Sequence, residues 1–194
     1  MDKKEDFDSD YIENSKFENI TFNKYYDYLE IKNCHFKKCN FENTTFQGID
    51  IDDSVFENSN LSNQDFTNRS YNNIEFNNCN LTGILFTDSY LENVVFNNCK
   101  LDYANFSNTK IKKVAFNNSE LKYTSFNQVK WKNLEFNNCN MEEAEFQKTI
   151  LKDIDLSNSN ITNIKIDINN FKGLIVSYDQ AVILSTILGI KVKN

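Results

Sequence analysis

Large apolar residues recur at every fifth position along most of the chain. A step of five from Ile31 to Phe171 meets 29 consecutive positions, and each holds a large apolar residue. All 17 phenylalanines lie in this frame or in an earlier frame that starts at Phe7 and reaches Phe22. A period of five fits neither an α-helix, near 3.6, nor a β-strand, near 2. A chain that turns a corner every five residues does fit it.

A longer period of 20 residues lies over the first. Asn-Asn follows four phenylalanines that are spaced by 20, and small residues recur at the same interval. These small residues are Cys39, Ser59, Cys79, Cys99, Ser119, Cys139 and Ser159. We therefore expect a coil of four sides and 20 residues. One coil cannot bury its own inward side chains, so neighbouring coils must stack into a solenoid.

Two places interrupt the pattern. Ile31 follows Phe22 by nine residues, whereas two repeats of five would give ten. This difference predicts a phase break near residues 23–30. Gln64 and Arg69 occupy inward positions that elsewhere hold small or apolar residues, so we expect a local distortion there. An unpaired arginine would be too costly to bury, and its side chain should reach solvent or a nearby acid.

Composition excludes several function classes. The 194 residues contain no proline and only 4 glycines, but 33 asparagines, which argues against a helical bundle and against glycine-rich phosphate loops. A net charge of −7 disfavours direct binding to nucleic acid or to an anionic membrane. No secretion signal or membrane-spanning segment is visible, so we expect a cytoplasmic protein.

The repeats resemble those of the pentapeptide-repeat family. The segments Cys-Asn-Leu-Thr-Gly at 79–83 and Ala-Asn-Phe-Ser-Asn at 104–108 are close to its consensus. This resemblance implies an all-β fold, a right-handed quadrilateral β-helix. We expect that β-helix over residues 1–172, followed by a C-terminal helix and tail over 173–194.

The C-terminal segment carries helix signals. Ser177 with Gln180 three residues later predicts a capping box, and Gly189 is a natural stop, so we expect a helix over 178–188. Its apolar residues form more than one narrow stripe, which favours two buried surfaces. One would close the end of the solenoid and the other would contact a second copy, the alternative being closure alone. The expected dimer interface comprises Tyr178, Ala181, Val182, Leu184, Ile187 and Leu188.

This tail, from Ser177 to Val192, resembles that of the Qnr quinolone-resistance proteins. The resemblance implies a homodimer that binds DNA gyrase or topoisomerase IV by imitating duplex DNA, and so protects the enzyme from quinolones. The loops that interrupt the repeats of several Qnr proteins are either absent here or reduced to the irregularity at 23–30, because the frame is unbroken from Ile31 to Phe171. The alternative is a non-catalytic repeat scaffold that binds another cytosolic protein.

Charge is unevenly distributed along the chain. Residues 1–95 have a net charge of −10, whereas residues 96–194 have a net charge of +3. The candidate DNA-mimicking acids are Glu42, Asp50, Asp52, Asp53, Glu57, Asp65, Glu75, Asp88 and Glu92. The basic counterpart contains Lys110, Lys112, Lys113, Lys122, Lys130 and Lys132. The alternative role for the acids is to keep a repetitive rod soluble.

Catalytic, metal and cofactor sites are not expected. All five cysteines (Cys34, Cys39, Cys79, Cys99 and Cys139) occupy the small inward position, which favours reduced, buried thiols. His35 is the only histidine and lies in an outward position, so it cannot belong to a histidine cluster. Tyr103 and Tyr123 are one coil apart and are expected to stack, either as a contact patch or as a stiffening ladder.

Overall fold

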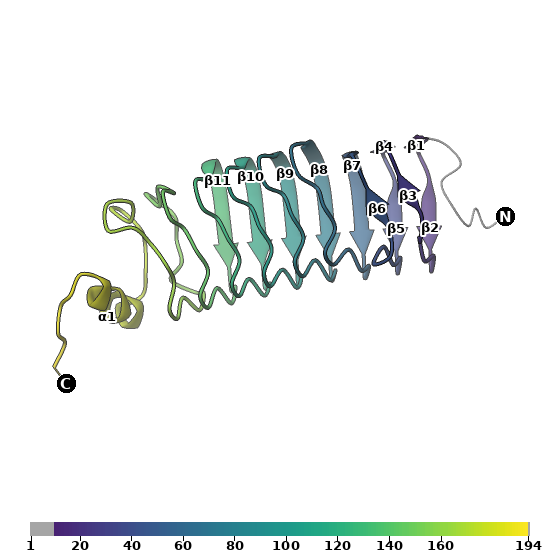
Figure 1. The fold of residues 1–194 in the computed structure, drawn as a ribbon. Helices are drawn as coiled ribbons and strands as arrows, with labels where there is room; N and C mark the ends of the chain where they lie inside the picture. Colours follow the sequence, from purple (N-terminus) through teal and green to yellow (C-terminus); the bar gives the residue numbers. More distant parts are fainter. Residues whose placement is uncertain (1–9, 194) are drawn as a thin grey trace.

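The computed structural model describes residues 10–193, which form a parallel β-solenoid with one C-terminal helix. Phe7, the first member of the early aromatic frame, lies outside the described residues. The coils stack along a rod, with β1 at one end and α1 at the other (Figure 1). The predicted fold class is confirmed. The repeat period of 20 residues equals the offset between paired residues of neighbouring coils over most of the rod.

Short strands precede the long ones in chain order. The strands are β1 (Tyr11–Glu13), β2 (Lys16–Glu18), β3 (Tyr25–Tyr26), β4 (Leu29–Lys32), β5 (His35–Lys37), β6 (Thr45–Phe46), β7 (Ile49–Glu57), β8 (Ser70–Asn77), β9 (Tyr90–Asn97), β10 (Lys110–Asn117) and β11 (Lys130–Asn137). The main sheet has the order β1-β4-β7-β8-β9-β10-β11 and is parallel. Its long strands each cover two sides of the coil.

Each of the four sides carries one inward column of large residues. Side 1 contains Ile51, Tyr71, Leu91, Ile111 and Trp131; side 2 contains Phe56, Phe76, Phe96, Phe116 and Phe136; side 3 contains Leu61, Leu81, Leu101, Leu121 and Met141; and side 4 contains Phe66, Phe86, Phe106, Phe126 and Phe146. Phenylalanine rings stack along a column, as in Phe96 on Phe116 at 4.7 Å between centroids. They meet the neighbouring column edge to face, as in Phe96 and Phe106 at 82°. Dispersion and aromatic geometry therefore fix the axis of the rod.

Asparagine serves the corners and the outer surface. Many corner residues have a positive φ, for example Asn73 at 54° and Asn93 at 54°, and asparagine tolerates this left-handed region better than most residues. Side-chain amides also bond from coil to coil: Asn97 donates to Asn77 at 2.8 Å, and Asn117 donates to Asn97 at 2.8 Å. These two uses explain the asparagine content.

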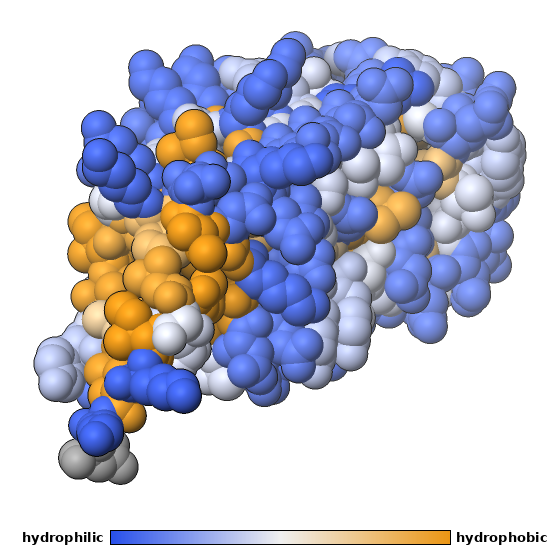
Figure 2. Space-filling model, turned by 60° about the vertical axis from the view of Figure 1, so that its left-hand side comes forward, coloured by the Kyte–Doolittle hydropathy of each residue, from blue (hydrophilic) through white to orange (hydrophobic). Residues whose placement is uncertain are grey.

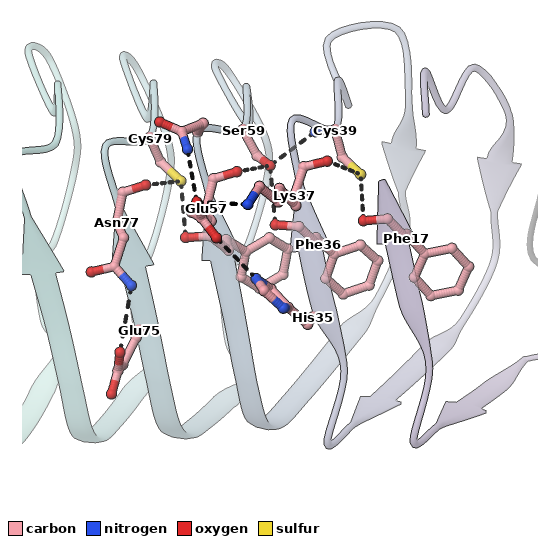
Figure 3. A network of polar contacts seen from close by, with 12 residues as sticks. Phe17, His35, Phe36, Lys37, Cys39, Glu57, Ser59, Glu75, Asn77 and Cys79 are labelled. Atoms are coloured by element: carbon pink, nitrogen blue, oxygen red, sulfur yellow. Dashed lines mark hydrogen bonds and ion pairs between the residues drawn. The ribbon is translucent and has the colours of Figure 1, made fainter. Parts of the chain in front are cut away.

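The column of small residues bonds to the backbone of the preceding coil. The Cys79 thiol donates to the carbonyl of Phe56 at 3.3 Å, and the Ser59 hydroxyl donates to the carbonyl of Phe36 at 3.3 Å (Figure 3). The Ser59 hydroxyl also accepts from the Cys39 amide at 3.0 Å. Small polar groups thus satisfy backbone groups at a corner where a larger side chain would not fit.

The phase break shortens one side of the first described coil. In that coil the register is 19, with Tyr11 opposite Glu30 and Lys16 opposite His35. From β3 onward it is 20. Tyr26 is buried four residues after Phe22, so the missing residue lies between them, and the frame resumes without a protruding loop.

The expected distortion occurs near Gln64 and Arg69. Gln64 stays inward, and its amide donates to the carbonyl of Phe41 at 2.9 Å. The side-4 stack breaks here, because Phe66 meets both Phe46 and Phe86 edge to face. The Arg69 guanidinium lies over the Tyr28 ring, 5.6 Å from its centroid. Gly48 makes room for it, since a Cβ there would lie 2.4 Å from an Arg69 nitrogen.

The helix α1 (Tyr178–Ile187) follows the last coil. Ser177 caps it in the predicted capping box. The Ser177 hydroxyl accepts from the backbone N–H of Gln180, and the side-chain oxygen of Gln180 accepts from the backbone N–H of Ser177. Gly189 follows the C-cap with φ of 73°, a conformation that glycine adopts without strain.

We predict that Phe96→Ala lowers the free energy of unfolding by about 3–5 kcal/mol, because Phe96 is fully buried between stacked rings and a cavity would remain. Phe171→Ala is the matched control, since Phe171 is only partly buried in the last coil and should cost less. Urea denaturation followed by circular dichroism measures both. Equal losses would contradict the stacked-column account.

Candidate functional site

Six of the nine candidate acids lie on one continuous sheet surface. Asp50, Asp52, Asp53 and Glu57 are on β7, Glu75 is on β8 and Glu92 is on β9. Each of the remaining three, Glu42, Asp65 and Asp88, lies outside the named strands, at sides 3 and 4 and at the corner before β9. The structure therefore concentrates the acids on sides 1 and 2 but does not bring all nine together.

Two of the sheet acids are paired with cations. Glu57 lies 3.3 Å from the Lys37 ammonium and 3.3 Å from His35 Nε2 (Figure 3). Glu92 lies 2.5 Å from the Lys112 ammonium and accepts from the Tyr90 hydroxyl. The hydrogen bonds from Lys112 and Tyr90 lower the pKa of Glu92. These two carboxylates offer less unbalanced negative charge to a partner than sequence alone suggested.

Three acids on β7 form what we call the acidic patch: Asp50, Asp52 and Asp53. Neutral donors orient them: the Tyr28 hydroxyl donates to Asp50 at 2.7 Å, the Asn72 amide to Asp52 at 2.8 Å, and the Asn73 amide to Asp53 at 2.7 Å. Bonds from neutral donors fix each carboxylate without cancelling its charge. The patch is therefore an ordered anionic surface near the β1 end of the rod.

Charge reverses along side 1. In one outward column Lys32 on β4 is followed in register by Asp52, Asn72 and Glu92, and then by Lys112 and Lys132. In the adjacent column Lys110 is opposite Lys130. The pair of Glu92 and Lys112 lies at the boundary. This face of the rod is thus anionic over β7–β9 and cationic over β10 and β11.

The helix α1 presents two different surfaces. Gln180 and Leu184 are buried against the last coil, and the Gln180 amide donates to the carbonyls of Leu156 at 2.8 Å and Ser159 at 2.6 Å. Leu184, expected at the dimer interface, therefore packs within its own chain and closes the solenoid. The spacing of apolar residues in the helix does not show which apolar side packs against the last coil.

The opposite surface of α1 and its surroundings form an exposed apolar end. Tyr178 is 84% exposed, and Ala181, Val182 and Leu188 are also exposed, while Ile187 is partly buried. Figure 2 shows apolar residues gathered over this end of the molecule. Ile183 on the helix is also exposed, as are four apolar residues that were not predicted to be in the interface: Ile168, Ile175, Ile190 and Val192. Of these four, Ile168 interrupts the polar outer pattern of the repeats, which was the available signal.

The cysteines behave as packing residues. All five are free and buried, and burial raises the pKa of the Cys39 and Cys139 thiols. Across residues 10–193, no three His, Cys, Asp or Glu side chains are placed to hold a metal ion. Tyr103 and Tyr123 stack as expected, at 4.9 Å between centroids. No helix within the described range is long and apolar enough to cross a membrane.

Comparison with protein families gives two matches. The model described as a pentapeptide repeat region matches residues 70–146, and one described as a BspA type leucine rich repeat region (6 copies) matches residues 5–102. A leucine-rich repeat pairs a strand with a helix or 3₁₀ turn in each repeat. Residues 10–102 instead form helix-free coils that continue those of residues 70–146. The geometry supports the first match throughout.

Solved structures with a similar fold include QnrB1, described as a plasmid-mediated fluoroquinolone resistance protein. A trypsin-treated variant of it is 23% identical, with 95% of this chain and 99% of that chain covered and a TM-score of 0.50. The full-length protein is 20% identical, with coverages of 93% and 100% and a TM-score of 0.43. The pentapeptide repeat protein Rfr23 from the cyanobacterium Cyanothece 51142 is 17% identical, with coverages of 66% and 64% and a TM-score of 0.29. A search of curated proteins gives no match.

We predict that Gln180→Met destabilises the docking of α1, because two carbonyls of the last coil lose their donor. Leaving such groups unsatisfied costs about 1–3 kcal/mol. Hydrogen exchange should speed up in α1 and the last coil while β8–β10 stay protected. Gln147→Met, at an exposed position, is the control. Unchanged exchange in α1 would show that Gln180 does not hold the helix.

Proposed function

We propose that this chain, whose residues 70–146 match a pentapeptide repeat region, binds DNA gyrase or topoisomerase IV in place of duplex DNA and protects the enzyme from quinolones. The activity is surface complementarity between two proteins, with no catalysis and no cofactor. A topoisomerase binds the anionic DNA backbone with a cationic surface, and an anionic rod can compete for it.

The acidic patch is the observation that carries this proposal. Asp50, Asp52 and Asp53 lie on a parallel sheet, are held by neutral donors, and have no lysine or arginine within salt-bridge distance among residues 10–193. Stacked coils lie about 4.7–4.9 Å apart, whereas duplex DNA carries one charge per about 1.7 Å. The protein therefore imitates the shape and the local charge of DNA, with a lower density of negative charge along its axis.

We further propose that two copies join through their C-terminal ends. The exposed part of α1, with Val182, Ile183 and Leu188, is continuous with apolar residues on either side of it. A contiguous apolar patch of this kind is typical of an interface. The acidic patches would then lie on the outer arms of the dimer, far from its centre.

A supercoiling assay with purified gyrase and a fluoroquinolone tests the proposed function. Added protein should restore supercoiling, and the triple variant Asp50→Asn, Asp52→Asn, Asp53→Asn should protect at least about tenfold less well, because the negative charge is lost. The positions equivalent to Asp52 and Asp53 in the next coil already hold Asn72 and Asn73, and the position equivalent to Asp50 holds the uncharged Ser70, so the fold accepts neutral side chains there.

The matched control for this assay is the triple variant Asp102→Asn, Glu120→Gln, Glu143→Gln. It removes the same number of negative charges, but around side 3. It should protect as well as the unaltered protein. If the unaltered protein at micromolar concentration restores no activity, the alternative of a scaffold for another protein is favoured. If both triple variants lose protection equally, the acidic patch is not the contact surface.

The dimer is tested with Leu188→Asp, which places a charge on the exposed apolar end and should give a monomer. Light scattering measures the mass. Leu184→Asp is not a suitable test, because Leu184 is buried against its own coil and its loss would disturb α1 itself. Lys100→Asp, an exposed change on side 3, is the control and should remain dimeric. A dimer that persists in Leu188→Asp would refute this interface.

A further inference from the structure

A recess of about 520 Å³ lies at the corner that leads into β11. It is lined by Gln128, Val129, Lys130, Trp131, Lys148 and Ile150. It lies toward the α1 end of the rod, on the cationic part of side 1, and is separate from the acidic patch. Its size is sufficient for a large apolar side chain.

Two departures from the repeat pattern create the recess. Trp131 occupies an inward position of side 1 but is only partly buried, because the indole is larger than the leucine and isoleucine side chains of that column. Its Nε1 donates to the carbonyl of Ile150 at 2.7 Å, which fixes the ring at the corner. Ile150 occupies an outward position that holds lysine in the two preceding coils, and it is 64% exposed. An aromatic and an aliphatic group thus meet at one accessible point.

Uncompensated positive charge surrounds this apolar point. Lys130 and Lys148 line the recess, and Lys110 is in register with Lys130. In the described part of the chain, none of these three ammonium groups lies within 4.0 Å of a carboxylate, whereas Lys112, Lys122 and Lys165 are all paired. The charge of the three lysines is therefore available to a partner.

We propose that this recess, which we call the Trp131 site, binds an acidic polypeptide segment that carries a large apolar side chain. The apolar side chain occupies the recess against Trp131 and Ile150, and flanking carboxylates of the segment pair with Lys110, Lys130 and Lys148. The inference is independent of the proposed function, which uses the opposite sign of charge at the other end of the same face.

A polypeptide fits this site better than a nucleic acid. Glu135 on β11 and Asp153 in the following coil limit the cationic surface, so a continuous phosphate backbone would soon meet carboxylates. The net charge of −7 also repels a long polyanion. An apolar recess among a few lysines matches a short acidic segment with one apolar anchor.

Trp131 is the only tryptophan, so its fluorescence reports on this site directly. The probe is the peptide acetyl-Glu-Glu-Leu-Glu-Glu-amide, titrated into the full chain at low and high salt. We expect a saturable change of emission, with an affinity at least about tenfold weaker at high salt. The peptide acetyl-Lys-Lys-Leu-Lys-Lys-amide should give no change. A 20-base-pair duplex is titrated in parallel.

The double variant Lys130→Glu, Lys148→Glu keeps the fluorescent reporter and should weaken peptide binding at least about tenfold. Lys16→Glu, Lys100→Glu makes the same change of charge at exposed positions away from the recess and should bind as the unaltered protein does. Circular dichroism confirms that each variant is folded. The proposal is overturned if the acidic peptide gives no saturable change, if the two double variants bind equally, or if the duplex binds more tightly than the peptide.

Discussion

Coil-to-coil stacking of inward side chains is the constraint on which the whole structure depends. Each coil supplies four large residues, and from β3 onward each backbone segment pairs with the segment 20 residues away. Because like stacks on like, Phe76, Phe96 and Phe116 lie nearly parallel at 4.7–5.1 Å. The pairing register and the ring spacing reinforce one another. Each turn is therefore fixed by the coil on which it stacks, and the coils form a rod.

This constraint leaves the outer positions free to carry function. The inward positions decide the coil, while the outward positions on side 1 change from Asp52 to Lys132 along one unbroken column. The fold tolerates either sign, since neither side chain enters the core. One face can therefore present an anionic surface over β7–β9 and a cationic surface with an apolar recess over β10 and β11.

The fold was accessible from sequence because its signal is periodic and local. The inward columns between Phe36 and Phe146 follow from counting in steps of five, and Ile166 takes the place of phenylalanine at the end of side 4. The capping box of Ser177 and Gln180 was likewise local. The role of Leu184 could not be predicted from a local pattern. Only the placement of α1 against the last coil shows which apolar side of the helix is buried.

The candidate sites were less accessible, because they depend on contacts between coils. Sequence grouped nine acids, but pairing between coils neutralises Glu57 and Glu92, and the winding of the chain separates Glu42 and Asp65 from the rest. The recess beside Trp131 depends on a ring that does not fit its column, which is a question of volume and not of pattern.

If the acidic patch imitates DNA, this protein and duplex DNA must compete for the same site on gyrase. Fluorescence anisotropy of a labelled duplex bound to gyrase measures whether this protein displaces it. We expect displacement that saturates and that is lost when the acidic patch is neutralised. A stable ternary complex, in which the duplex stays bound while the protein binds as well, would contradict it.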